Sequence, residues 1–243
     1  MGTRPWHPIP IVDCGDPLQA LPAELLRLEP HPYASAGAPY GAGQSPFQLR
    51  RGVLRRLLQA QAELQRRNPS CRLAIFDGWR PVAVQAFMVQ RTVHEQCRAA
   101  GVDPEQPSQQ RLQIEAEVGR FWAPPSPDPA TPPPHSTGAA VDLTLADAAG
   151  RPLDMGGEID AIGALSEPDH HAAAAAADPT SQAALWHQRR CLLAEVMGLA
   201  GFAQHPNEWW HFSYGDQLWA WLQQQPRAIY GRVEPDASSV LTC

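Results

Sequence analysis

His135 and Asp142 lie in the stretch PPPHSTGAAVDLTL, where a proline-rich segment gives way to a small-residue turn and then to an apolar run. Imidazole nitrogen and carboxylate oxygen are zinc ligands, and a catalytic zinc usually takes three ligands from the protein and leaves one position for water. The spacing is too long for one helical face, but it suits a loop residue followed by a strand residue after a turn through Gly138. The pair could therefore supply two ligands. Taken alone, however, a loop histidine and a surface carboxylate are the commoner interpretation.

The stretch EWWHF, at positions 208 to 212, offers a third ligand in His211. Glu208, three residues earlier, could act as a general base on a metal-activated water. Because a regular strand would direct these two side chains to opposite faces, the pairing requires Glu208 to lie in a turn or bulge. The alternative is an aromatic core strand that contains a hydrogen-bonded histidine.

The stretch FDGWRP, at positions 76 to 81, contains an arginine, Arg80, just after the short apolar segment 71–77. Asp77 and Gly78 are expected to form a turn and Pro81 to begin the next helix. Arg80 would then project from this connection toward whatever lies beyond the sheet edge. An arginine in that place can stabilise an oxyanion, whereas the alternative is a surface arginine paired with a carboxylate.

Together, FDGWRP, HSTGAAVD and EWWHF resemble the D-alanyl-D-alanine dipeptidases of the VanX type, in a zinc family that also contains D,D-carboxypeptidases. The resemblance implies one zinc ion per chain with three ligands, His135, Asp142 and His211. It implies that Glu208 is the catalytic base and that Arg80 stabilises the tetrahedral intermediate. Asp160, at the end of MGGEID, would bind the ammonium group of the substrate, and Tyr33, in HPYASAGAPYG, would help to close the same pocket. The implied reaction is hydrolysis of a dipeptide, D-alanyl-D-alanine above all.

The resemblance extends over roughly residues 30 to 215 and departs from the family pattern at three places. Pro133 stands where a serine is usual, Ala38-Pro39 replaces an asparagine-phenylalanine pair, and Ile159 replaces a phenylalanine. All three places concern substrate contacts and not the metal. Two alternatives stay open: a zinc D,D- or L,D-carboxypeptidase acting on cell-wall peptides, and a non-catalytic zinc-binding module of the same fold, which would need neither Glu208 nor Arg80.

Hydrophobic periodicity and turn residues predict the elements that must position these side chains. A helix is expected within residues 45–69, with Ser45 as N-cap and Pro46 as the first helical residue. Further helices are expected at 81–100, roughly 107–120 and 181–200, the last stopped by Gly201. Strands are expected at 71–77, at 139–147 before a hairpin turn at 147–153, and as two short aromatic strands within 202–214. The alanine-rich segment 171–179 could extend a helix or be a tolerated insertion.

The order of these elements shows no regular alternation of strand and helix and no glycine-rich phosphate loop. It predicts a single α+β domain over residues 1–243, with helices packed on a small, mainly antiparallel sheet and the zinc site at that sheet. The proline-rich segment 123–134 is expected to be a loop.

Composition limits the partners and the compartment. The chain has 243 residues, 44% of them hydrophobic, and a net charge of −6 with 19 scattered basic residues. These values suit one sizeable core and disfavour nucleic acid or a membrane surface as a partner. No targeting segment or spanning apolar run is apparent, and the five cysteines contain no CxxC pair, so a cytoplasmic protein is expected. A small dipeptide is the expected partner, and a homo-oligomer is possible.

Overall fold

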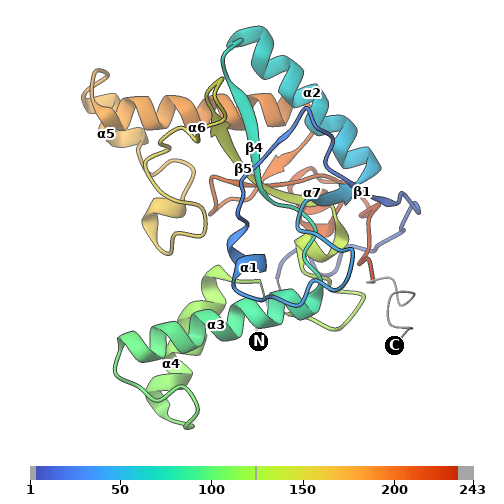
Figure 1. Ribbon diagram of the computed structural model, residues 1–243, viewed down its shortest axis with the longest axis vertical. Coiled ribbons are helices and arrows are strands. Elements are labelled where there is room, and N and C mark those ends of the chain that lie inside the picture. The colour runs from blue at the N-terminus through green and yellow to red at the C-terminus, as the bar shows by residue number, and fades with distance from the viewer. Residues whose placement is uncertain (1–3, 124, 235–243) are drawn as a thin grey trace.

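The computed structural model describes residues 4–123 and 125–234 (Figure 1). Five strands form one sheet in the order β2-β4-β5-β7-β6, and β1 and β3 form a separate antiparallel pair. Strand β2 is parallel to β4, and the other neighbouring strands of the large sheet are antiparallel. The strands are β1 (Leu18–Ala20), β2 (Leu26–Arg27), β3 (Gln48–Arg50), β4 (Arg72–Asp77), β5 (Ala140–Ala146), β6 (Ala203–Gln204) and β7 (His211–Ser213). The predicted α+β fold with a small, mainly antiparallel sheet is confirmed.

Helices make up most of the remaining regular structure in the described part of the chain. Two short 3-10 helices, η1 (Pro134–Thr137) and η2 (Ala164–Ser166), lie in the connections. The α-helices are α1 (Pro32–Ser35), α2 (Arg51–Arg67), α3 (Val82–Ala99), α4 (Gln109–Phe121), α5 (Ala172–Ala177), α6 (Gln182–Leu199) and α7 (Gln217–Leu222). None of these helices is long and apolar enough to cross a membrane.

The main core lies where α2 and α6 pack against each other and against the sheet (Figure 1). Leu57 of α2, Leu193 of α6 and Leu143 of β5 are completely buried in it. Burying a leucine side chain stabilises a fold by roughly 1.5–3 kcal/mol, so this layer holds β4 and β5 firmly. Those two strands, together with β7, carry or flank the residues of the site.

A second group of helices, α3 and α4, lies side by side at the other end of the molecule from α2 and α6 (Figure 1). Val93 and Cys97 of α3 pack against Val118 of α4 in a small separate cluster. Nearer the sheet, Val84 of α3 packs in a cluster with Tyr33. The helix pair therefore forms one side of the region in which Tyr33 is buried.

The prediction that Ser45 caps a helix beginning at Pro46 is wrong. Helix α2 begins at Arg51, because the preceding residues are held in an extended conformation by partners distant in sequence. Strand β3 pairs with β1, and the carbonyl oxygen of Pro46 accepts a hydrogen bond of 2.8 Å from the N–H of Gly78. The Ser45 hydroxyl accepts a hydrogen bond from the N–H of Phe47 in a local turn.

The other predicted elements agree with the structure to within a few residues. Ser108 caps α4, and Gly201, with φ of 89°, follows the end of α6. The alanine-rich segment forms the separate helix α5, which packs on α6. Segment 147–153 turns back on β5, to which it is joined by a single β-bridge. Segment 125–133 of the proline-rich loop has no regular structure, and residue 124 lies outside the described residues.

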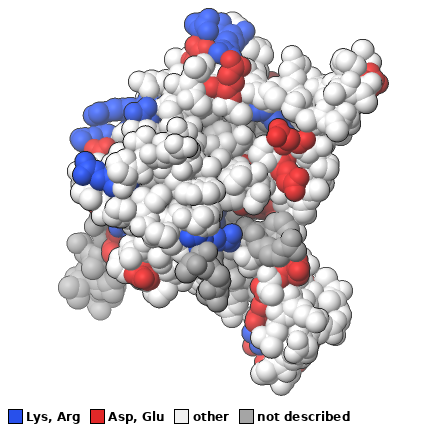
Figure 2. All heavy atoms as spheres, turned by 180° about the vertical axis from the view of Figure 1, so that it is seen from behind, with Lys and Arg blue, Asp and Glu red and all other residues white. Residues whose placement is uncertain are grey.

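Charged side chains are scattered over the face shown in Figure 2, with blue and red atoms interspersed and no broad basic field. The cysteines that the structure describes are free thiols, and Cys243 lies outside the described residues. These are Cys14, Cys71, Cys97 and Cys191.

Candidate active site

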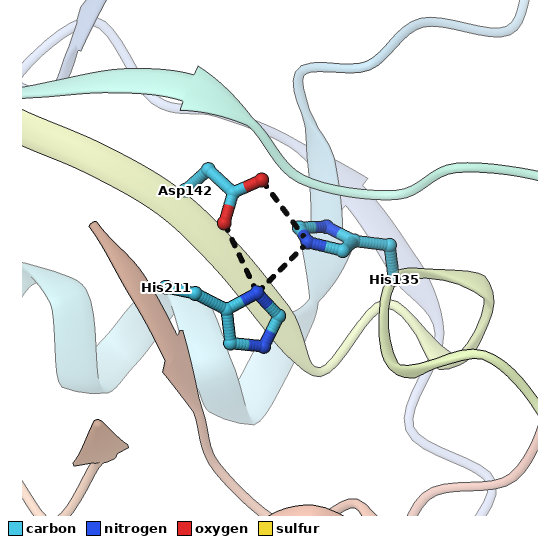
Figure 3. Close-up of side chains that lie close together, drawn as sticks. All are labelled: His135, Asp142 and His211. Atoms are coloured by element: carbon cyan, nitrogen blue, oxygen red, sulfur yellow. Dashed lines mark hydrogen bonds and ion pairs between the residues drawn. The ribbon is translucent and has the colours of Figure 1, made fainter. Parts of the chain in front are cut away.

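The three predicted ligands come together at the sheet (Figure 3). Asp142 of β5 lies directly opposite His211 of β7 in the antiparallel register, so the two side chains share one face. His135 comes from η1, which leads into β5 through Gly138 in the left-handed conformation, with φ of 68°. Residues other than glycine rarely adopt this conformation, and a Cβ atom there would also displace the end of the Leu18 side chain, 2.4 Å away. Glycine is therefore favoured at the turn that brings His135 back to the sheet.

The distances between the three side chains suit a single small cation. The Nε2 atom of His135 lies 3.2 Å from Asp142 Oδ2 and 3.2 Å from His211 Nδ1, which in turn lies 3.1 Å from Asp142 Oδ1. Ligands about 2.0–2.2 Å from a tetrahedral zinc are roughly 3.3–3.6 Å apart. Asp142 Oδ1 is buried and accepts no well-aligned hydrogen bond, a condition that a cation would relieve. The cluster therefore fits zinc with little rearrangement.

Outer hydrogen bonds orient both imidazoles. Nδ1 of His135 lies 2.7 Å from the carbonyl oxygen of Gly78 and can donate to it, which leaves Nε2 free to bind a metal. Nε2 of His211 lies 3.3 Å from the Ser213 hydroxyl, which donates to the carboxylate of Asp216 at 2.7 Å. Burial would by itself raise the pKa of Asp142, but its contacts with the two histidines hold that pKa well below its usual range.

Glu208 lies in the turn between β6 and β7, as its pairing with His211 requires. Its Oε2 atom is 3.7 Å from Nδ1 of His211, and its side chain is 22% exposed. Burial, reinforced by the charges of Asp142 and Asp160, raises the pKa of the Glu208 carboxyl well above its usual range. A carboxyl group with a raised pKa beside a metal centre suits proton transfer.

Arg80 lies three residues after the end of β4. It is paired with a carboxylate, but this pair is buried and not on the surface. Its Nε and Nη2 atoms lie 2.8 and 2.6 Å from Asp77 Oδ2. Nη1 donates to the side chain of Gln85 at 2.8 Å, and Nη2 lies 3.4 Å from Asp142 Oδ2. One edge of the guanidinium group therefore faces the metal centre while Asp77 and Gln85 fix the rest.

Asp160 and Tyr33 are in contact, because the Tyr33 hydroxyl donates a hydrogen bond to Asp160 Oδ2. Asp160 has a positive φ of 65°, which is unusual for a residue other than glycine and is often found at functional sites. Burial, with a contribution from Asp142, raises the pKa of Asp160 to about 6, against the opposing effect of Arg80.

A pocket of about 440 Å³ brings these groups together, and its walls include His135, Asp142, His211, Glu208, Arg80 and Asp160. This volume lies in the range of small-molecule sites. Sequence reasoning missed other residues of the pocket. Gln85 and His205 lack a distinctive motif of their own, and Arg4 and Trp6 come from the start of the chain. The buried Asp77 could have been noticed as a carboxylate three residues before Arg80.

A buried His-Asp-His cluster at an antiparallel sheet, with a carboxyl group beside it in a pocket, is the arrangement expected of a metallopeptidase site. Comparison with known proteins agrees: the model of the D-ala-D-ala dipeptidase family matches residues 27–229. The chain belongs to this family and is a metallopeptidase.

Two curated relatives are D-alanyl-D-alanine dipeptidases. That of Synechocystis sp. is 46% identical over 95% of this chain and 97% of the relative. That of Escherichia coli (strain K12) is 31% identical over 58% of this chain and 53% of the relative. Among solved structures, a mutant of the vancomycin resistance D,D-pentapeptidase VanY in complex with Zn(II) matches with a TM-score of 0.43 and 16% identity. That match covers 76% of this chain and 83% of the other.

Proposed function

We propose that this protein hydrolyses a free dipeptide, D-alanyl-D-alanine, with one zinc ion held by His135, Asp142 and His211. The observation that carries the proposal is the convergence of these three side chains within 3.1–3.2 Å of one another in a pocket that also contains Glu208 and Asp160. The names of both curated relatives support the choice of substrate.

A zinc ion bound by these residues would supply a Lewis acid that acidifies a water molecule and polarises the scissile carbonyl. Glu208 would accept a proton from the attacking water at a carboxylate oxygen. It would then give that proton to the nitrogen of the leaving amino acid. Two free amino acids would be released.

Arg80 and Asp160 would act at different points of the substrate. The guanidinium edge of Arg80 would stabilise the negative charge that develops on the carbonyl oxygen, and its bonds to Asp77 and Gln85 would hold it ready for this. Asp160, hydrogen-bonded by Tyr33, would bind the substrate ammonium group. A carboxylate in a confined pocket selects for a free amino terminus, because a blocked one would leave its charge without a partner.

The substrate assignment is tested with kcat/KM values for D-Ala-D-Ala, its N-acetyl form and a tripeptide ending in D-Ala-D-Ala. The parent protein should lose roughly thirty-fold or more on acetylation, which corresponds to about 2–5 kcal/mol for breaking a buried charge pair. Asp160→Asn should remove most of that preference. Asp169→Asn, an exposed aspartate of the same connection, is the matched control and should keep the preference of the parent.

A carboxypeptidase would give the reverse result, because it recognises the carboxyl end and accepts a blocked or extended amino end. Equal or faster cleavage of the acetylated or longer substrates would therefore replace the dipeptidase assignment with the carboxypeptidase one. If the zinc-loaded protein hydrolysed none of these peptides, a non-catalytic zinc-binding module would be the better description.

A further inference from the structure

A segment from the start of the described chain, residues 4–14, here called the N-terminal strap, forms part of the pocket wall. Its residues Arg4, Trp6 and His7 line the same pocket as Glu208. The strap is distant in sequence from the metal centre, so only the folded chain brings its side chains to the site. A ligand that fills this part of the pocket would contact the Arg4 side chain.

The strap is fastened to α7. Trp6 is only 9% exposed, and its ring centroid lies 5.7 Å from that of Trp221. The side-chain nitrogen of Gln217 lies 3.2 Å from the carbonyl oxygen of His7 and 2.7 Å from that of Ile9. Side-chain donation to the carbonyl groups of two strap residues, together with the buried indole, fixes the backbone that carries Arg4.

Arg4 has no carboxylate partner among the residues that the structure describes. Its side chain donates to the carbonyl oxygen of Gly119 at 3.5 Å, and its guanidinium carbon lies 5.8 Å from the Trp6 ring centroid. Arg80, the other arginine of the pocket wall, is bound to Asp77. The printed sequence contains no lysine, so the permanent cations among the described residues of the pocket wall are Arg80, which is bound to Asp77 beside the metal centre, and Arg4.

Ring contacts place the strap on the Glu208 side of the pocket. The Trp6 ring centroid lies 6.4 Å from that of His205, whose Nδ1 atom lies 3.9 Å from Glu208 Oε1. The pocket wall thus contains a carboxylate, Asp160, and a cation, Arg4, from two separate segments of the chain. A dipeptide carries the two complementary charges, with its charged ends about 7 Å apart when extended.

We propose that Arg4 binds the terminal carboxylate of the substrate and so makes the enzyme selective for a free carboxyl end. The inference rests on the proposed function, in which Asp160 holds the ammonium end. Arginine is suited to this task because its planar guanidinium can donate two parallel hydrogen bonds to one carboxylate. With both charged ends of the substrate bound, the pocket would select peptides of two residues over longer ones.

The test compares D-Ala-D-Ala with its carboxyl-terminal amide, D-Ala-D-Ala-NH2, in the zinc-loaded full-length protein. The parent should prefer the acid over the amide by about ten- to one-hundred-fold in kcat/KM. Arg4→Gln should abolish this preference by raising KM for the acid, while kcat/KM for the amide changes less than about two-fold. Arg4→Lys, which keeps the charge but not the planar fork, should retain part of the preference.

Arg55→Gln, which removes an exposed arginine of α2 outside the pocket, is the charge-matched control and should behave as the parent does. If Arg4→Gln slows the acid and the amide equally, Arg4 supports the strap and does not bind the carboxylate, and the inference fails. It fails also if the parent cleaves acid and amide equally well, although the proposed function then survives. A parent that cleaves neither substrate overturns the proposed function and this inference together.

Discussion

At the residue scale, the carboxyl group of Glu208 is the one on which turnover should depend most. Glu208→Gln preserves the shape of the side chain but removes its ability to accept a proton. General-base catalysis contributes about 10²–10⁴-fold to the rate. The kcat for D-Ala-D-Ala should therefore fall by this factor or more, while zinc content and thermal stability stay unchanged. Glu158→Gln, at an exposed position, serves as the control. A kcat for Glu208→Gln within a few-fold of the parent would mean that another group is the base.

Asp160 should give substrate affinity its dependence on pH. Its pKa is raised to about 6, so the carboxylate is charged above this pH and becomes neutral as the pH falls through it. Because only the charged form attracts an ammonium group, KM should rise toward tenfold per pH unit below about 6. Bound zinc must be measured at each pH, since acid also displaces metals. A KM profile that is identical in the parent and Asp160→Asn would count against this role.

At the scale of elements, the connection that carries Asp160 is held by a buried arginine of α6. Arg190 is 2% exposed and donates to the carbonyl oxygens of Met155 and Glu167 at 2.8 Å and of Leu165 at 3.1 Å. Backbone carbonyl groups on both sides of Asp160 are thus bound by a single side chain.

Replacing this residue, as in Arg190→Met, should loosen the connection without touching the metal ligands. The free energy of unfolding should fall by about 2–4 kcal/mol, and KM should rise more than kcat falls. Denaturant unfolding and steady-state kinetics check the two parts, with Arg98→Met on the exposed side of α3 as the control. A variant with unchanged KM would show that Asp160 is positioned by other contacts.

The elements themselves were mostly predictable from local sequence, and the exception is informative. Residues 45–50 have good helix-start signals, but their backbone groups bond to β1 and to Gly78, which no local pattern reveals. The turn that contains Glu208 was predicted on chemical grounds. Glu208 can act beside His211 only if both side chains lie on one face, and a regular strand through EWWHF would place them on opposite faces.

At the scale of the whole molecule, the pocket is assembled from segments spread along nearly the entire described chain, from Arg4 to His211. The three motifs predicted the ligand cluster in combination, through their resemblance to a known family, because each motif alone has a commoner structural interpretation. The strap could not be predicted, since its place depends on Gln217 and on pairing between Ile11 and Ala228, a contact without a sequence signature.

Zinc should also stabilise the whole fold, because its three ligands join η1, β5 and β7. Each tenfold excess of free zinc over its Kd adds about 1.4 kcal/mol to the stability of the folded state. For a chain of this size, each kcal/mol of added stability raises the Tm by roughly 2–4 °C. Chelation should therefore lower the Tm of the parent and leave that of His135→Ala almost unchanged. Equal shifts in the two proteins would place the stabilising metal elsewhere.

The most direct test of the central claim is the zinc content per chain of the purified parent, His135→Ala and the control His170→Ala, measured after dialysis against metal-free buffer. His170 is exposed and lies outside the pocket wall. The account predicts about one zinc per chain in the parent and in His170→Ala, and a large loss in His135→Ala, since three protein ligands are needed for a catalytic zinc site. Full zinc occupancy in His135→Ala would contradict it.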